Sequence, residues 1–230
     1  MLIECLRLTA SQVYLVHGPR PVLVDVGLAR DAPTVTAWLA RKQIAPRDLG
    51  AIVLTHAHAD HAGAVSALAH WSGAPVVVGM GDVSTVHSGG RDGSSPPTGI
   101  RRVLASFGLI QAYPPLPRHY PVIPVETGLE LEALGGVGAV LPVPGHTSGS
   151  VAVVLDSGDV IAGDVLIGGY LLGVVARSTP VSHFHHVDRS RNRASIGALL
   201  STGAHTWHLG HGGPVGSESV RAWLDRSPSG

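Results

Sequence analysis

Thr55-His56-Ala57-His58-Ala59-Asp60-His61 places four side chains that can bind a metal ion within six residues. The run follows Ala51-Ile52-Val53-Leu54, a short apolar stretch typical of a buried strand. Three imidazoles and a carboxylate are costly to bury unless each finds a hydrogen-bond partner or a metal ion. His56 and His58 are two residues apart, so on an extended chain they point to the same side. The run therefore predicts a metal site at the end of a strand.

The composition is that of a globular chain without net charge. Of the 230 residues, 44% are apolar and 14% are charged, with Lys+Arg and Asp+Glu balanced at 16 each. A chain of this length buries a substantial core, and we expect one domain over residues 1–230. Because balanced charges supply no basic field to hold a polyanion, we expect a small-molecule substrate and no nucleic-acid partner.

The cysteine count and the apolar segments limit the cellular context. Cys5 is the single cysteine, which excludes an internal disulfide and a thiolate-rich zinc or iron–sulfur site. The first residues lack the pattern of a signal peptide, and no window reaches the roughly 18–20 apolar residues of a membrane span. We therefore expect a cytoplasmic protein with no membrane partner. The sequence leaves the oligomeric state open, a homodimer included.

Strand and helix patterns alternate around the histidine run. The apolar periodicity predicts a helix from the run to about residue 71. Further helices are expected over residues 34–41, 188–200 and 217–224. Strands are expected over residues 2–8, 13–17, 21–25, 51–54, 75–78, 129–132, 138–143, 150–155, 160–162 and 206–209, with a hairpin turn at Ser157-Gly158.

A segment rich in Gly, Ser and Pro lies at about residues 81–99, within a wider stretch from residue 79 to residue 117 that has a different character from its surroundings. We expect a short helix over residues 100–107 in this stretch. A flexible surface loop is one interpretation, and a lid over the site is the other.

Three later segments combine a strand end, a glycine and a metal-binding side chain. These are Gly145-His146, Gly163-Asp164 and Gly210-His211. Glycine beside each ligand permits a tight backbone turn, so that the side chain can point into a crowded site. Ligands drawn from loops at one edge of a sheet are how a rigid scaffold builds an open site.

Taken in order along the chain, these motifs resemble the metallo-β-lactamase fold superfamily of metallohydrolases, and within it the glyoxalase II-like branch. The resemblance rests on residues 22–27, the histidine run, Gly145-His146, Gly163-Asp164 and His211, and covers nearly the whole chain. It implies an α/β (α+β) fold, a four-layer αββα sandwich with the site at one edge of the two sheets.

The resemblance also implies a set of ligands for two divalent metal ions. The first ion would be held by His56, His58 and His146, the second by Asp60, His61 and His211, with Asp164 bridging both. Zinc is the first choice, and iron and manganese suit the same donors. Asp25 matches a family aspartate that supports the site without binding metal. This role fits the need of ligating histidines to have their other ring N–H held in place.

Two such ions can share a water and lower its pKa from 15.7 toward about 7, which supplies a hydroxide for attack on an acyl or phosphoryl centre. Asp60 is the candidate to orient this nucleophile. Tyr170 could point its hydroxyl toward the substrate carbonyl, as a tyrosine does in the lactonase branch, or could simply pack in the core. Because no Gly-x-Ser-x-Gly elbow occurs and Cys5 is far from the motifs, a serine or cysteine hydrolase fits poorly.

The first functional hypothesis is a hydrolase of a small thioester, lactone or other ester. The resemblance argues against a β-lactamase, because superfamily members that open β-lactams typically lack an aspartate at the position of Asp164. The second hypothesis is a mononuclear iron persulfide dioxygenase of the same fold, whose matching ligands would be His58, His146 and Asp164. A phosphodiesterase with the same metals is a weaker alternative. His183, His185 and His186 form another cluster, which we expect on an exposed loop or a pocket wall and not at a third metal.

Overall fold

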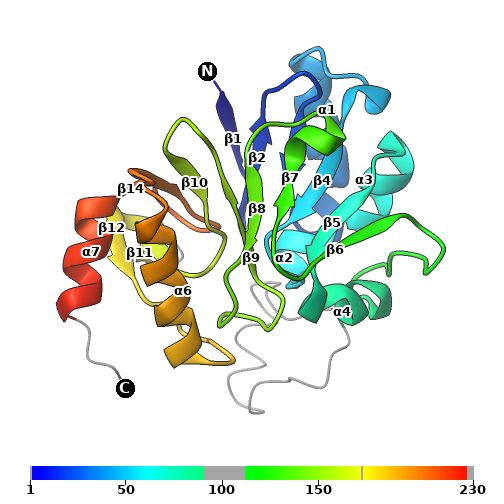
Figure 1. The fold of residues 1–230 in the computed structure, drawn as a ribbon. Helices are drawn as coiled ribbons and strands as arrows, with labels where there is room; N and C mark the ends of the chain where they lie inside the picture. Colours follow the sequence, from blue (N-terminus) through cyan, green and yellow to red (C-terminus); the bar gives the residue numbers. More distant parts are fainter. Residues whose placement is uncertain (1, 91–111, 172, 227–230) are drawn as a thin grey trace.

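Two β-sheets pack face to face in a computed structural model that describes residues 2–90, 112–171 and 173–226 (Figure 1). The first sheet has the order β1-β2-β3-β4-β5-β6 in the described residues, antiparallel from β1 to β3 and parallel from β3 to β6. Its strands are β1 (Ile3–Arg7), β2 (Gln12–Val16), β3 (Val22–Val24), β4 (Ala51–Leu54), β5 (Val76–Gly79) and β6 (Val122–Val125).

The second sheet has the order β14-β13-β10-β9-β8-β7. Its strands are β7 (Leu129–Glu130), β8 (Ala139–Pro142), β9 (Val151–Val154), β10 (Asp159–Ile161), β13 (Thr206–His208) and β14 (Val215–Gly216). A separate hairpin joins β11 (Ile167–Tyr170) to β12 (Val175–Val181).

Helices cover the outer face of each sheet. Beside the first sheet lie α1 (Ala32–Arg41), α3 (Val65–Ser72) and α4 (Val83–Ser88), and beside the second lie α6 (Arg189–Ser201) and α7 (Ser217–Arg226) (Figure 1). The one-turn helix α2 (Ala59–Ala62) lies within the histidine run. Short 3-10 turns are η1 (Ala29–Asp31), η2 (Pro46–Asp48), η3 (Met80–Asp82) and η4 (Leu131–Leu134).

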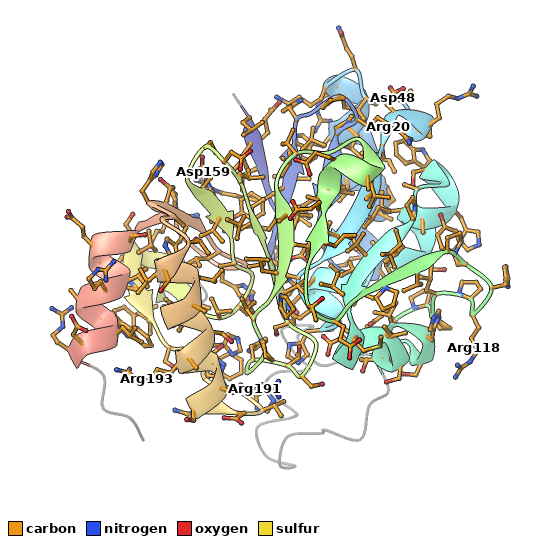
Figure 2. The ribbon with its side chains drawn as sticks, in the orientation of Figure 1. Arg20, Asp48, Arg118, Asp159, Arg191 and Arg193 are labelled. Atoms are coloured by element: carbon orange, nitrogen blue, oxygen red, sulfur yellow. The ribbon has the colours of Figure 1, made fainter. Side chains whose placement is uncertain are left out.

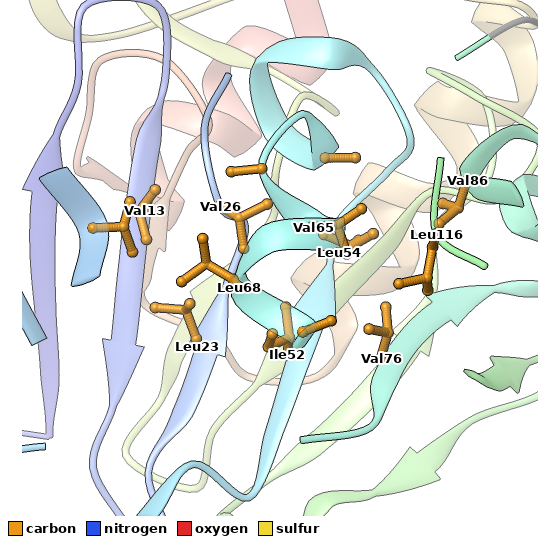
Figure 3. Close-up of a cluster of buried hydrophobic side chains, with 14 of the residues drawn as sticks. Val13, Leu23, Val26, Ile52, Leu54, Val65, Leu68, Val76, Val86 and Leu116 are labelled. Carbon is orange, nitrogen blue, oxygen red and sulfur yellow. The ribbon is translucent and has the colours of Figure 1, made fainter. Parts of the chain in front are cut away.

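Strands that are buried on both faces explain the layering. On β4, Ile52 and Leu54 pack with the helices over the first sheet, whereas Ala51 and Val53 belong to the cluster between the sheets. Successive strand side chains point to opposite faces, so one apolar strand serves two cores. Figure 3 shows the helix-side cluster, with Leu68 of α3 beside the strand residues. A third cluster lies between the second sheet and its helices. The expected αββα sandwich is confirmed.

Most of the predicted elements are present within a few residues of their expected bounds, including the β9–β10 hairpin. The strand expected over residues 129–132 is wrong in its second half, because the chain turns into η4 after Glu130. The strands β6, β11, β12 and β14 were not predicted. Of the stretch considered as a lid, residues 83–88 form α4. The remainder from 91 to 111, including the helix expected over residues 100–107, lies outside the described residues.

Candidate metal centre

The predicted ligands all follow strands that run toward the same end of the sandwich. In the first sheet, Asp25 follows β3 and the histidine run follows β4, which is parallel to β3. In the second sheet, Asp164 follows β10 and His211 follows the parallel strand β13. The opposite end of the molecule, where these strands begin, carries three side chains labelled in Figure 2. Arg20 precedes β3, Asp48 precedes β4 and Asp159 is the first residue of β10. The carboxyl ends of parallel strands meet at one edge, so the ligands converge there.

The structure brings the seven predicted ligands together. Two groups of donor atoms could each hold an ion. One group comes from His56, His58 and His146 and the other from Asp60, His61 and His211, and within each group the donor atoms lie within 4.8 Å of one another. Asp164 faces both groups. Its Oδ2 lies 3.2 Å from Nε2 of His211 and 3.8 Å from Nε2 of His146, and its Oδ1 lies 3.6 Å from Nε2 of His61. A carboxylate in this position can reach two ions at once.

The spacing between these atoms fits shared metal ions better than hydrogen bonds. An N–H···O hydrogen bond is usually about 2.7–3.2 Å long. Two atoms that each lie about 2.0–2.2 Å from one tetrahedral ion are roughly 3.3–3.6 Å apart. The distances from Asp60 to His211 and to His61, 3.4 and 3.6 Å, lie in this range. His56 is farther from Asp164, at 4.0 Å, while Nε2 of His146 lies 3.0 Å from Nδ1 of His58 and Nε2 of His211 lies 3.2 Å from Asp164, both at hydrogen-bond distance. The donor set therefore fits divalent ions.

Unpartnered buried atoms support the same conclusion. Within the described residues, buried atoms of this centre without a hydrogen-bond partner are Nε2 of His56 and His61, both ring nitrogens of His211, Oδ2 of Asp60 and Oδ1 of Asp164. A buried polar atom that stays unpaired costs about 1–3 kcal/mol. So many at one point would be hard to sustain in a folded protein unless a cation satisfied them.

The other ring nitrogens of His56, His61 and His146 have partners outside the centre, whereas Nδ1 of His211 has none among the described residues. Nδ1–H of His61 donates to Oδ2 of Asp25 at 2.7 Å. The backbone N–H of Thr55 donates to Oδ1 of the same carboxylate at 2.8 Å, and the Thr55 hydroxyl donates to Oδ2 at 2.8 Å. Asp25 has a left-handed backbone, with φ 59°, which Asp tolerates better than most residues. Asp25 therefore lies where a residue that orients His61 would be expected.

Asp82 is a buried carboxylate that the sequence analysis missed. One of its oxygens accepts hydrogen bonds from the Ala57 backbone N–H and the Thr147 hydroxyl, both at 2.8 Å, and the other accepts from the Gly149 backbone N–H at 3.1 Å. Ala57 lies between two ligands of the run, and Thr147 follows His146 directly. Burial raises the pKa of Asp82, although these donors oppose the rise. Its only sequence signal was a position shortly after the predicted strand at residues 75–78.

Burial and charge act differently on the two sides of the centre. Burial, together with neighbouring imidazoles, holds the pKa values of His56 and His146 well below their usual range. For His211, burial is outweighed by the Asp164 and Asp60 carboxylates, and its pKa rises to about 9. Burial alone would raise the pKa of Asp164, but His211 and His61 hold it well below the usual range. The carboxylates are thus ionised and His56 and His146 are neutral, the forms that bind cations, whereas a metal ion would have to displace a proton from His211.

Two glycines beside ligands are required by close contacts. A Cβ atom on Gly210 would collide with Oδ1 of Asp164, and one on Gly145, whose φ is 139°, would collide with the backbone of Asn192 in α6. The backbone carbonyl of Gly145 also accepts the N–H of Asp188, the residue that caps α6. These glycines let the second-sheet loops approach the histidine run.

The second histidine cluster is buried or partly buried, which rules out one of its two predicted positions for His183. His183 is 5% exposed, so an exposed position is wrong for this residue, while a place in the pocket wall agrees with its position. Its Nε2 lies 3.6 Å from Oδ2 of Asp164, and burial lowers its pKa to about 4. His185 and His186 are partly buried. Tyr170, at the end of β11, is 57% exposed and therefore does not pack in the core.

Comparison with known proteins identifies the family. Residues 6–171 match the metallo-beta-lactamase superfamily. The chain belongs to this superfamily. A probable metallo-hydrolase, YflN of Bacillus subtilis (strain 168), is 30% identical over 177 residues, which are 70% of this chain and 63% of that relative. The chain thus spans less than two thirds of the relative's length.

Solved structures share the fold of this superfamily member. The B3 metallo-beta-lactamase BLEG-1 superposes with a TM-score of 0.69 at 22% identity, over 98% of each chain. The archaeal superfamily protein ST1585 from Sulfolobus tokodaii superposes with a TM-score of 0.67 at 21% identity, over 97% of this chain and 85% of the other. At such identities the likeness shows the fold. In the described part of the chain, no helix is both long and apolar enough to cross a bilayer.

Metal removal should destabilise the protein, because the buried donor atoms would lose their partner. At a free metal concentration about 1,000 times the dissociation constant, one ion stabilises the fold by about 4 kcal/mol. For a chain of this size that corresponds to roughly 8–16 °C in Tm. Thermal unfolding with and without a chelator measures the shift. Equal Tm values after verified metal loading and removal would contradict the site.

Replacing Asp82 with alanine should loosen both ligand loops, because the N–H groups of Ala57 and Gly149 would lose their acceptor. We expect about 1–3 kcal/mol of lost stability for each unsatisfied group, and metal affinity lower by about 10–100-fold. Chelator competition and chemical denaturation measure the two effects. Asp225→Ala, on the exposed side of α7, is the control. If both variants bind metal like the wild type, Asp82 does not position the ligands.

Proposed function

We propose that this protein is a metal-dependent hydrolase, acting on a small thioester, lactone or other ester at a centre that holds two divalent ions. The observation that carries the proposal is the pair of three-residue donor groups with Asp164 between them. YflN, described as a probable metallo-hydrolase, supports the hydrolase class. Zinc is the first choice of metal, with iron and manganese compatible, and a glyoxalase II-like relationship within the superfamily is part of the same proposal.

When bound by these residues, a pair of divalent ions would supply an activated water at neutral pH and would polarise the electrophilic oxygen of a substrate. The side chains of the protein would bind the ions, and neighbouring groups fix the orientation of these side chains. Asp60 is fully enclosed, with Oδ2 lying 3.4 Å from Nε2 of His211, and is the candidate to orient the nucleophile as well as to bind metal. Asp25 keeps His61 in one orientation, and the His185 carbonyl does the same for His146 by accepting its Nδ1–H at 2.9 Å.

The surroundings of the centre favour an uncharged organic substrate over a phosphodiester. Two segments border the centre. Gly173, at the tip of the β11–β12 hairpin, packs against Gly212, which follows His211. In the loop before α6, the Val187 N–H donates to the His146 carbonyl. Large apolar side chains are exposed on these segments and on η3, which contacts Ser148 through Gly81. They are Met80, Tyr170, Leu171, Val174, Val175, Phe184 and Val187. Such side chains suit the apolar part of an ester or thioester.

Two alternatives are less well supported. A mononuclear iron dioxygenase using His58, His146 and Asp164 would leave Asp60, His61 and His211 without an ion, although their inward atoms are buried and unpartnered. A β-lactamase is disfavoured by the resemblance, because superfamily members that open β-lactams typically lack an aspartate at the position of Asp164. The fold similarity to B3 enzymes does not bear on substrate.

Metal content and substrate class can be tested together on purified protein. We expect about two divalent ions per chain and turnover of at least one class in a panel of thioesters, lactones and simple esters, with β-lactams and phosphodiesters hydrolysed more slowly. Elemental analysis and initial rates give the two readouts. One iron per chain, with thiol-dependent oxygen consumption, would instead establish the dioxygenase.

Asp164→Ala should remove metal and activity together, because one side chain serves both donor groups. We expect the variant to retain fewer than two ions and to lose nearly all turnover. Asp156→Ala, in the exposed turn between β9 and β10, is the matched control and should behave as the wild type. Full retention of two ions by Asp164→Ala would disprove the bridging role.

Tyr170 is proposed as a hydrogen-bond donor to the substrate carbonyl. Its side chain is exposed on the hairpin whose tip packs against the His211 loop. Tyr170→Phe should lower kcat by about 100-fold with little change in KM if the hydroxyl acts in the transition state. Steady-state kinetics on the best substrate measure this. Unchanged kcat would remove Tyr170 from the catalytic residues.

A further inference from the structure

His183 lies against the metal centre from a segment outside the five motifs. It follows β12 in the loop that leads to α6, and its side chain is almost completely buried. Its ring centroid is 4.5 Å from that of His146, and its Nε2 is 3.6 Å from Oδ2 of Asp164. The donor atoms of His146, Asp164 and His183 all lie within 4.8 Å of one another.

The ring is held so that Nε2 faces the centre. Nδ1 lies 2.9 Å from the carbonyl oxygen of His185, the distance of an N–H···O hydrogen bond, and 3.1 Å from the His185 backbone nitrogen, whose N–H can donate to it in the other tautomer. When Nδ1 carries the proton and donates to this carbonyl, the lone pair of Nε2 is free for a cation. The ring also packs on Phe184, with centroids 4.1 Å apart.

We propose that His183 is an eighth metal ligand, which binds through Nε2 the ion shared by His146 and Asp164. This inference rests on the proposed metal centre. At 3.6 Å, the approach of His183 to Asp164 is too long for a hydrogen bond and equals the His61–Asp164 separation on the other side. A pair of atoms bound to one ion has this spacing.

The ligand would come from a loop that is already tied to His146 at two further points. His185 accepts the Nδ1–H of His146 at 2.9 Å, and the Val187 N–H donates to the His146 carbonyl at 3.2 Å. Metal binding by His183 would therefore fasten the loop that carries the exposed side chains of Phe184 and Val187 beside the centre. An added imidazole also favours zinc, iron or cobalt over magnesium and calcium, which prefer oxygen ligands.

His186 provides a matched control within the same loop. It is a partly buried histidine whose ring centroid lies 5.5 Å from that of His146, and the donor groups found among the described residues do not include it. Substitution of His186 removes an imidazole from the same neighbourhood without removing the proposed ligand.

The test compares His183→Ala, His183→Gln and His186→Ala with the wild type, each loaded with Zn²⁺ or Co²⁺. We expect both His183 variants to bind one ion at least tenfold more weakly in chelator competition and to change the visible absorption of the cobalt form. His186→Ala should match the wild type. The glutamine variant keeps a polar side chain of similar reach, so it provides the readout if the alanine variant does not fold.

The outcomes separate this inference from the proposed function. Wild-type affinity for both ions and an unchanged cobalt spectrum in a folded His183 variant would overturn the eighth ligand and leave the two-ion centre standing. Wild-type protein that binds no ion would overturn both. A changed spectrum in the His183 variants supports the ligand even if no ester in the panel is hydrolysed, because neither readout depends on turnover.

Discussion

The Asp164 carboxylate is 4% exposed and faces imidazoles contributed by both sheets. An ionised carboxylate in this position needs positive charge, and the inward nitrogens of His56, His61 and His211 need a partner as well. Divalent ions would satisfy both requirements at once. Much of the surrounding structure can be understood as the means of holding these groups against one another, since strand ends from two sheets must meet within a few ångströms.

That convergence depends on supports located behind the ligands. Asp25 connects the ends of β3 and β4 by accepting from Thr55, and it fixes His61. Asp82 connects the histidine run to the loop of His146. Gly210 allows the last loop to approach Asp164. These contacts are enclosed by apolar layers, so the donors are held by a rigid scaffold in the way that preorganised metal sites require.

The sequence was informative where ligand spacing and strand pattern coincide. The run from His56 to His61 and the glycine-flanked ligands could be predicted because each follows an apolar strand, and parallel strands place their ends together. Asp82 and His183 could not be predicted in the same way. Asp82 acts through loops distant in sequence, and His183 follows a hairpin whose strands were not recognised. Its neighbours His185 and His186 carry the same residue type, so composition could not distinguish the buried ring from the others.

The residues that would bind the metal ions and those that would select the substrate come from different parts of the fold. The ligands come from motifs with fixed places in the fold, and they determine which ions and which kind of attack the site can support. In our proposal the substrate would instead contact the β11–β12 hairpin, η3 and the loop before α6, which carry the exposed apolar side chains. An ester with an apolar portion fits both parts, which is why we favour it over charged phosphodiesters.

Anomalous diffraction from crystals of the zinc-loaded protein, measured on both sides of the zinc absorption edge, would locate the bound ions and their ligands. We expect two peaks about 3.5–4 Å apart, with Asp164 between them. One should lie about 2.0–2.2 Å from donor atoms of His56, His58 and His146, and the other at that distance from Asp60, His61 and His211. A single peak, or peaks that do not contact Asp164, would contradict the two-ion centre.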